Sequence, residues 1–121
     1  MSSANKQKGT RWETTCVNYL KEKFSEVANR IERRALSGNF DKGDIVGFHS
    51  WVLECKDRAD WSKSLAQILR ETHEERINAN AKYGAAVIKR RQASVEQAYV
   101  VMDFETFVEV LRDTEAYNAV S

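Results

Sequence analysis

The feature that most constrains this fold is the distribution of residues that turn the backbone. The 121-residue chain has no proline and five glycines, and three of these, Gly38, Gly43 and Gly47, fall within ten residues. Because glycine reaches backbone conformations that other residues avoid, tight turns are expected there. Nothing divides the chain into repeats or linked units, so a single domain over residues 1–121 is predicted.

Hydrophobic periodicity predicts how the rest of the chain is organised. Trp12, Cys16 and Leu20 recur every four positions, as on the buried side of an amphipathic helix. Continuous apolar runs at 85–88 and 99–102 are typical of strands that are buried on both faces. The expected elements are a helix over 10–24, strands over 28–36, 44–48 and 51–57, a helix over 61–82, strands over 84–91 and 98–103, and a helix over 104–117.

This αβββαββα order predicts an α/β fold in which a central mixed β-sheet is flanked by helices. In the final helix, Phe107, Val108 and Leu111 are expected to face the core. The polar, basic residues 1–9 are expected to form a flexible arm. Hydrophobic residues make up 42% of the chain and charged residues 31%, which is typical of a globular domain with a real core.

Charge and cysteine content exclude several classes of protein. Lys and Arg number 19 against 18 Asp and Glu, so the net charge of +1 excludes a polycation, and any nucleic-acid signal must be local. Cys16 and Cys55 stand apart in apolar surroundings, which predicts buried thiols. The chain lacks a signal-peptide pattern and any run of the roughly 20 apolar residues that a membrane helix needs. A cytoplasmic protein with no membrane partner is therefore expected.

The residues that carry chemistry lie just after the glycine-rich segment. In a strand, Glu54 and Lys56 point to one face while Leu53 and Cys55 point to the other. Asp44 joins Glu54 if a hairpin with a three-residue loop or a bulge pairs the two residues. Two converging carboxylates suit a hard cation such as Mg²⁺ or Mn²⁺, and Lys56 would position or deprotonate a water that attacks a phosphodiester. The pattern predicts metal-assisted hydrolysis.

These residues resemble the PD-(D/E)XK nuclease superfamily, and within it the Holliday junction resolvases of archaea and bacteriophages. The segments that carry the resemblance are Gly43-Asp44 at the family's Pro-Asp position, Glu54-Cys55-Lys56 as its ExK element, the Ser37-Gly38 loop, and Lys8-Gly9-Thr10-Arg11-Trp12-Glu13 in the first helix. Gly43 in place of proline is the departure. The expected order of elements matches the superfamily core over most of the chain, which implies a restriction-endonuclease-like fold.

The resemblance implies a role for each matching residue. The implied metal ligands are Asp44, Glu54, Glu13 and the main-chain carbonyl of Cys55. Lys56 would be the catalytic lysine, and Gln67 resembles a polar residue that many of these nucleases place over the site. The implied activity is that of a Mg²⁺-dependent endodeoxyribonuclease that cuts four-way DNA junctions by paired nicks, with Mn²⁺ as a substitute and no small-molecule cofactor.

Paired nicks also have consequences for assembly. One protomer offers a single metal site, so two symmetric cuts require a homodimer. A phage-encoded enzyme of this kind would act in the cytoplasm of the bacterial host.

A local excess of basic residues supports a DNA partner. Basic residues gather before the first expected helix, ahead of the glycine-rich segment and after the fourth strand, whereas the C-terminal part is acidic and is expected to face away from DNA. Basic surfaces of this kind bind the phosphate backbone largely without regard to sequence. The residues predicted to contact DNA, among which Ser37 comes from the resemblance to archaeal resolvases, are Lys8, Arg11, Arg30, Arg33, Arg34, Ser37, Lys42, Lys89, Arg90 and Arg91.

Other interpretations of the same residues stay open. A repair nuclease that acts on flaps, single strands or duplex ends would need the same site without the dimer. A non-catalytic DNA-binding module could keep the fold. The plainest interpretation is a surface salt bridge between Glu54 and Lys56, worth about 0–1 kcal/mol, next to an Asp44 that caps a turn.

Overall fold

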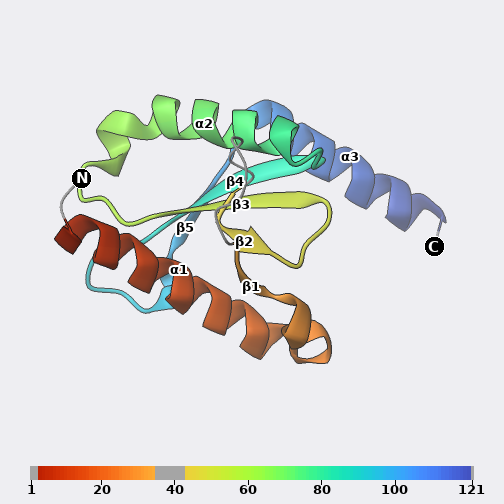
Figure 1. The fold of residues 1–121 in the computed structure, drawn as a ribbon. Coiled ribbons are helices and arrows are strands. Elements are labelled where there is room, and N and C mark those ends of the chain that lie inside the picture. Colours follow the sequence, from red (N-terminus) through yellow and green to blue (C-terminus); the bar gives the residue numbers. More distant parts are fainter. Residues whose placement is uncertain (1–2, 35–42, 121) are drawn as a thin grey trace.

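The computed structural model describes residues 3–34 and 43–120. Within these ranges the helices are α1 (Ser3–Lys23), α2 (Leu65–Asn78) and α3 (Phe104–Val120), with 3₁₀ turns η1 (Ser25–Arg30), η2 (Trp61–Ser64) and η3 (Val95–Gln97). The strands are β1 (Glu32–Arg33), β2 (Ile45–Val46), β3 (Trp51–Lys56), β4 (Tyr83–Ile88) and β5 (Tyr99–Val101) (Figure 1). Ser37 and Lys42, both predicted to contact DNA, lie outside the described residues.

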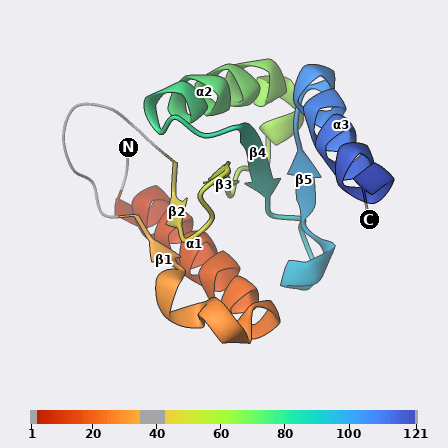
Figure 2. The same cartoon turned by 90° about the vertical axis from the view of Figure 1, so that its right-hand side faces the viewer.

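The strands β3, β4 and β5 form a mixed sheet in the described part of the chain. β3 runs parallel to β4, with Glu54 opposite Ala86, and β5 runs antiparallel to β4. β1 and β2 form a separate antiparallel pair. A hydrogen bond connects this pair to β3, because the backbone N–H of Asp44 donates to the carbonyl of Leu53 at 3.0 Å. Helices α1 and α2 cover opposite faces of the sheet (Figure 2). The predicted α/β class with a mixed sheet is confirmed.

The apolar core is divided between the two faces. On the α1 face, buried residues of α1 pack against Ile31 and against residues of β2 and β3. The cluster consists of Trp12, Cys16, Val17, Ile31, Ile45 and Cys55. The indole N–H of Trp12 donates to the carbonyl of Val87 at 3.1 Å and thereby attaches α1 to β4. On the α2 face, Ile68 packs against Ala86 and Ile88 of β4. Burial of both faces explains why β4 is an almost continuous apolar run.

The first helix is longer than its periodicity predicts. It begins at Ser3 rather than at residue 10, so residues 3–9 are helical where a flexible arm was expected. This extension contains no proline, and its lysine Lys8 is held by an ion pair with Asp57 at 3.6 Å. The helix therefore continues through polar residues that lie before the apolar stripe, and Lys8 connects this part of it to Asp57.

The strand expected over 28–36 is also wrong in most of its length. Residues 25–30 form the turn η1, and within the described part of this segment, up to residue 34, only Glu32 and Arg33 pair as a strand. Ile31, which is 1% exposed, is the single deeply buried anchor of this segment. Because the residues before it face solvent and have no neighbouring strand, they turn rather than extend.

The C-terminal elements differ most from expectation. β5 is a largely exposed edge strand, with Val100 60% exposed, instead of a strand buried on both faces. Helix α3 leaves Phe107 44% and Leu111 45% exposed, so these side chains do not enter the core as predicted. The reason lies in the sheet order, because β5 pairs with β4 on one side only and α3 lies beyond it (Figure 2).

Candidate active site

Strand β3 presents the predicted pair of charged residues to helix α2. Glu54 is 5% exposed, and its Oε1 lies 3.6 Å from the Nζ of Lys56. The same ammonium lies 3.8 Å from Oε2 of Glu71 on α2. Alternation along the strand placed both side chains on one face, but that face is covered by α2 and is not a solvated surface.

Asp44 joins this pair through the backbone. Its Oδ2 accepts the N–H of Cys55 at 2.7 Å, which fixes the carboxylate beside β3, at the residue that separates Glu54 from Lys56. The backbone pairs Asp44 with Leu53 rather than with Glu54, so the expected register is off by one residue. The hairpin is irregular because the carboxylate of Asp44 takes the place of a backbone acceptor.

The position of Asp44 depends on the glycine before it. Gly43 has φ of +94°, a conformation that side chains disfavour, and a Cβ added there would lie 2.8 Å from Cγ1 of Val52. Proline locks φ near −65°, so the family's proline could not replace Gly43 in this backbone. Gly43 is therefore a structural requirement of this hairpin.

Glu75 of α2 is a site residue that the sequence pattern missed. It is 5% exposed, and its carboxyl group forms a hydrogen bond with that of Glu54. Burial, the hydrogen bond with Glu75 and the charge of Asp44 together raise the pKa of Glu54 far above its usual value. The available signal was helical spacing, because Ile68, Thr72 and Glu75 recur at intervals of four and three residues and form the buried stripe of α2.

Lys56 keeps its proton in this environment. Its burial lowers the pKa, but the surrounding carboxylates, first Glu54 and then Glu71, outweigh this effect and raise the pKa above its ordinary value. A lysine of this kind holds positive charge and orients a partner, whereas a general base must be deprotonated. Of the two roles predicted for Lys56, the electrostatics favour positioning.

Gln67 and Glu13 lie at the border of the site. Gln67 is exposed and donates from Nε2 to Oε1 of Glu71 at 3.0 Å, so it reaches Lys56 only through Glu71. Glu13 of α1 lies 3.9 Å from Nη2 of Arg33 in β1. The two residues come from helices on opposite faces of the sheet, and these contacts connect Gln67 to Glu71 and Glu13 to Arg33.

Cys55 points to the opposite face of β3, where it packs against Cys16 of α1. Both thiols are free and buried, as the sequence predicts. The hydrogen bond with Cys16, followed by burial, raises the pKa of the Cys55 thiol. A protonated, buried thiol is unreactive, so these cysteines contribute packing.

The basic residues predicted to contact DNA fall into two groups. Lys8, Lys89 and Arg91 surround Asp57 at the C-terminal end of β3. Arg90 lies over the ring of Tyr99, 5.7 Å from its centre. The other group, at the opposite end around η1 and β1, contains Arg30, Arg33 and Arg34, and Arg11 is exposed on α1.

The oxygen donors at the acidic centre suit a hard divalent cation. Among residues 3–34 and 43–120, no three His, Cys, Asp or Glu side chains are grouped as a metal site. However, Mg²⁺ is often held by only one or two carboxylates, with water and substrate phosphate as its other ligands. Asp44 and Glu54 supply two carboxylates, and Oε2 of Glu54 is buried without a hydrogen bond. This donor set fits Mg²⁺ or Mn²⁺.

Comparisons with known proteins add no family. No protein-family model, curated protein sequence or solved structure gives a significant match to this chain. Across the described ranges, no helix combines the length and the apolar character needed to cross a membrane.

Proposed function

We propose that this protein is a Mg²⁺-dependent, structure-selective endodeoxyribonuclease, a Holliday junction resolvase that cuts four-way DNA junctions by paired nicks. The observation that carries the proposal is the meeting of Asp44, Glu54 and Lys56 at one end of β3, with Asp44 bound to the backbone between the other two. A surface salt bridge explains an exposed pair, but it does not explain a Glu54 that is 5% exposed.

We infer a restriction-endonuclease-like core, supported by a helix, an irregular hairpin and a following helix that surround these residues. The resemblance of Gly43-Asp44 and Glu54-Cys55-Lys56 to the superfamily's motif supports it as well. The proposed cellular site is the cytoplasm, that of the bacterial host if the protein is encoded by a phage.

Each side chain has a defined task in this proposal. Asp44 and Glu54 would hold the cation, which when bound supplies an activated water and charge stabilisation at the scissile phosphodiester. Lys56, held protonated by Glu54 and Glu71, orients the attacked phosphate or the water through its positive charge. Glu75 keeps Glu54 in place from the α2 side.

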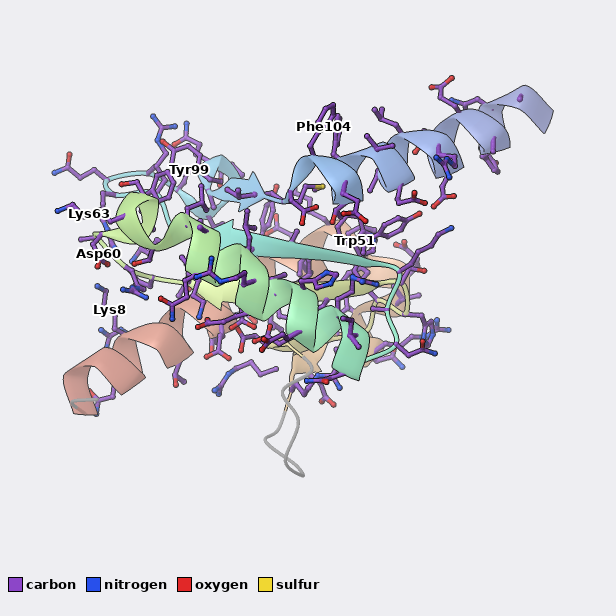
Figure 3. The ribbon with its side chains drawn as sticks, turned by 90° about the horizontal axis from the view of Figure 1, so that it is seen from above. Lys8, Trp51, Asp60, Lys63, Tyr99 and Phe104 are labelled. Carbon is purple, nitrogen blue, oxygen red and sulfur yellow. The ribbon has the colours of Figure 1, made fainter. Side chains whose placement is uncertain are left out.

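Paired cutting requires a second copy of the chain, and α3 offers a surface for it. Phe104, Phe107, Val108 and Leu111 form an exposed apolar stripe along one side of this helix. Figure 3 shows Phe104 directed away from the sheet. We propose that this stripe is the homodimer interface, which would place two acidic centres in one symmetric particle.

The decisive experiment compares Glu54→Gln with wild type on a labelled four-way junction. Wild type is expected to make paired, symmetric nicks with Mg²⁺ and none with EDTA. Glu54→Gln is expected to cut more than about 100-fold more slowly, because it removes a proposed metal ligand that is worth several kcal/mol in the transition state. Glu74→Gln, an exposed neighbour of Glu75 on α2, is the matched control and should cut normally.

Matched linear duplex, flap and single-stranded substrates separate the alternatives. Cutting of flaps or single strands in preference to junctions would replace the resolvase with a repair nuclease. If the protein binds these DNA substrates but cuts none of them with Mg²⁺, the DNA-binding module would be the remaining interpretation. Normal cutting by Glu54→Gln would show that the site has been misplaced.

A further inference from the structure

The residue after Lys56 organises a second polar cluster. The side chain of Asp57 is 2% exposed, and its carboxylate lies 2.6 Å from Nη1 of Arg91, 3.6 Å from Nζ of Lys8 and 3.9 Å from Nζ of Lys89. These cations come from the start of α1 and from the segment that follows β4. The carboxylate therefore joins two distant parts of the chain.

The charges of this cluster do not balance. Three cations surround one carboxylate, so two positive charges are in excess. The side chains of Lys8, Lys89 and Arg91 are 35–42% exposed, whereas the side chain of Asp57 is almost completely buried. One cation suffices to neutralise a buried carboxylate, and the surplus charge faces solvent. Such an arrangement attracts an anion from outside.

We propose that Lys8, Lys89 and Arg91 form a phosphate-binding cluster for the backbone of a nucleic acid, distinct from the acidic centre. Lys56 and Asp57 are consecutive, with Cα atoms about 3.8 Å apart, so the cluster adjoins the acidic centre along the chain. The identity of the polyanion as nucleic acid rests on the proposed function. In Figure 3, Lys8 lies at the end of the molecule away from the C-terminal end of α3.

An acidic lipid surface is the other polyanion to consider, and the structure favours nucleic acid. Peripheral membrane binding combines basic residues with large apolar side chains that enter the bilayer. Beside this cluster, the ring of Trp12 lies under Lys89, with Nζ 6.0 Å from its centre, but Trp12 is 4% exposed and its N–H is bonded to Val87. It has no freedom to insert.

The test is a matched pair of double variants. Lys8→Gln/Lys89→Gln removes the two excess charges and leaves Arg91 on Asp57, so the buried carboxylate keeps a partner and the fold is retained. Lys21→Gln/Lys82→Gln makes the same charge change at the other ends of the same helix and strand. Lys21 is about 20 Å from Lys8 along α1, and Lys82 is about 20 Å from Lys89 along β4.

Binding to a labelled four-way junction is measured in EDTA, so that no cutting occurs, over a range of salt concentrations. Lys8→Gln/Lys89→Gln is expected to weaken binding about tenfold at moderate salt and to reduce the slope of log K against log salt by about 2, one per lost phosphate contact. The control pair is expected to change the slope by less than about 0.5.

Each outcome decides one claim. Equal weakening by the two pairs, or no weakening by either, overturns the cluster as a phosphate site. Stronger binding of wild type to phosphatidylserine vesicles than to DNA, lost in Lys8→Gln/Lys89→Gln, also overturns it in favour of a lipid surface. If only Lys8→Gln/Lys89→Gln loses affinity while wild type cuts no substrate with Mg²⁺, the phosphate cluster stands and the nuclease proposal fails.

Discussion

The face of the sheet under α1 is filled by apolar side chains, whereas the face under α2 also encloses two carboxylates. Trp12, Cys16 and Cys55 represent the first face. Glu54 and Glu75, each 5% exposed, lie in the second beside a small apolar cluster. The residues named on both faces are buried, so the two groups differ in their chemistry and not in their exposure.

This difference separates the stabilising part of the molecule from the part suited to catalysis. Apolar burial contributes roughly 25 cal/mol per Å² removed from water, while burial of an ionised group costs several kcal/mol unless it is well paired. The α1 face therefore stabilises the fold, and the α2 face carries a costly arrangement that places charge where a phosphate could react. Replacing a buried apolar side chain under α1 and replacing the buried carboxyl group of Glu54 under α2 should therefore change stability in opposite directions.

The largest expected effect is on the α1 face. Trp12→Ala should lower the free energy of unfolding by about 3–5 kcal/mol, because it removes a buried indole and its hydrogen bond to Val87. Denaturant unfolding measures the change, with the exposed Asn18→Ala on the same helix as control. A loss below about 1 kcal/mol would mean that this face is not the main source of stability.

On the α2 face, Glu54→Gln should stabilise the protein, and increasingly so at high pH. The pKa of Glu54 is raised in the folded state, so wild-type stability is fully present below the usual carboxyl pKa and is lost as pH rises toward the folded value. We expect wild type to lose about 2 kcal/mol between about pH 5 and pH 8, within the limit of about 1.4 kcal/mol per pH unit for one proton.

The experiment is urea unfolding in EDTA at several pH values. The curve of Glu54→Gln should be flatter than that of wild type, and Glu74→Gln should follow wild type. Parallel curves for Glu54→Gln and wild type would show that the Glu54 carboxyl is not desolvated.

A smaller effect tests how tightly α2 packs on β4. A Cβ added to Gly84 would lie 3.1 Å from Cγ2 of Thr72, which is 2% exposed. Gly84→Ala should therefore destabilise the protein by about 1–2 kcal/mol. In a Thr72→Ser background, which lacks Cγ2, the loss should fall below about 0.5 kcal/mol. If the two changes in the free energy of unfolding are additive in this double-mutant cycle, residues 84 and 72 are not in steric contact.

The smallest effect on unfolding is expected outside both faces, on α3. Phe107→Ser should change the free energy of unfolding of the monomer by less than about 0.5 kcal/mol, because Phe107 is 44% exposed. In sedimentation velocity the same variant should convert a dimer to a monomer, while Glu105→Gln, exposed on the same helix, should leave the dimer intact. A dimer that survives Phe107→Ser would remove this stripe from the proposed interface.

Much of the candidate site follows from local rules. Strand alternation is enough to put Glu54 and Lys56 on one face, and the nearby glycines indicate the irregular hairpin that brings Asp44 to them. Glu75 is different, because it approaches Glu54 only when α2 packs on β3, across a sequence separation that no periodicity describes. Lys56 likewise has neighbours from α2 that set its charge state.

The same limit applies to α3. An amphipathic pattern shows that Phe107 and Leu111 share an apolar stripe, but it does not show what covers that stripe. The sequence alone determined the α/β class and the approximate positions of the main helices, of β3 and of β4. It also determined which side chains of β3 share a face of the sheet. These features depend on short-range geometry. Only the tertiary structure decided the carboxyl pair, the cation cluster on Asp57 and the exposure of α3, because each depends on how distant segments pack.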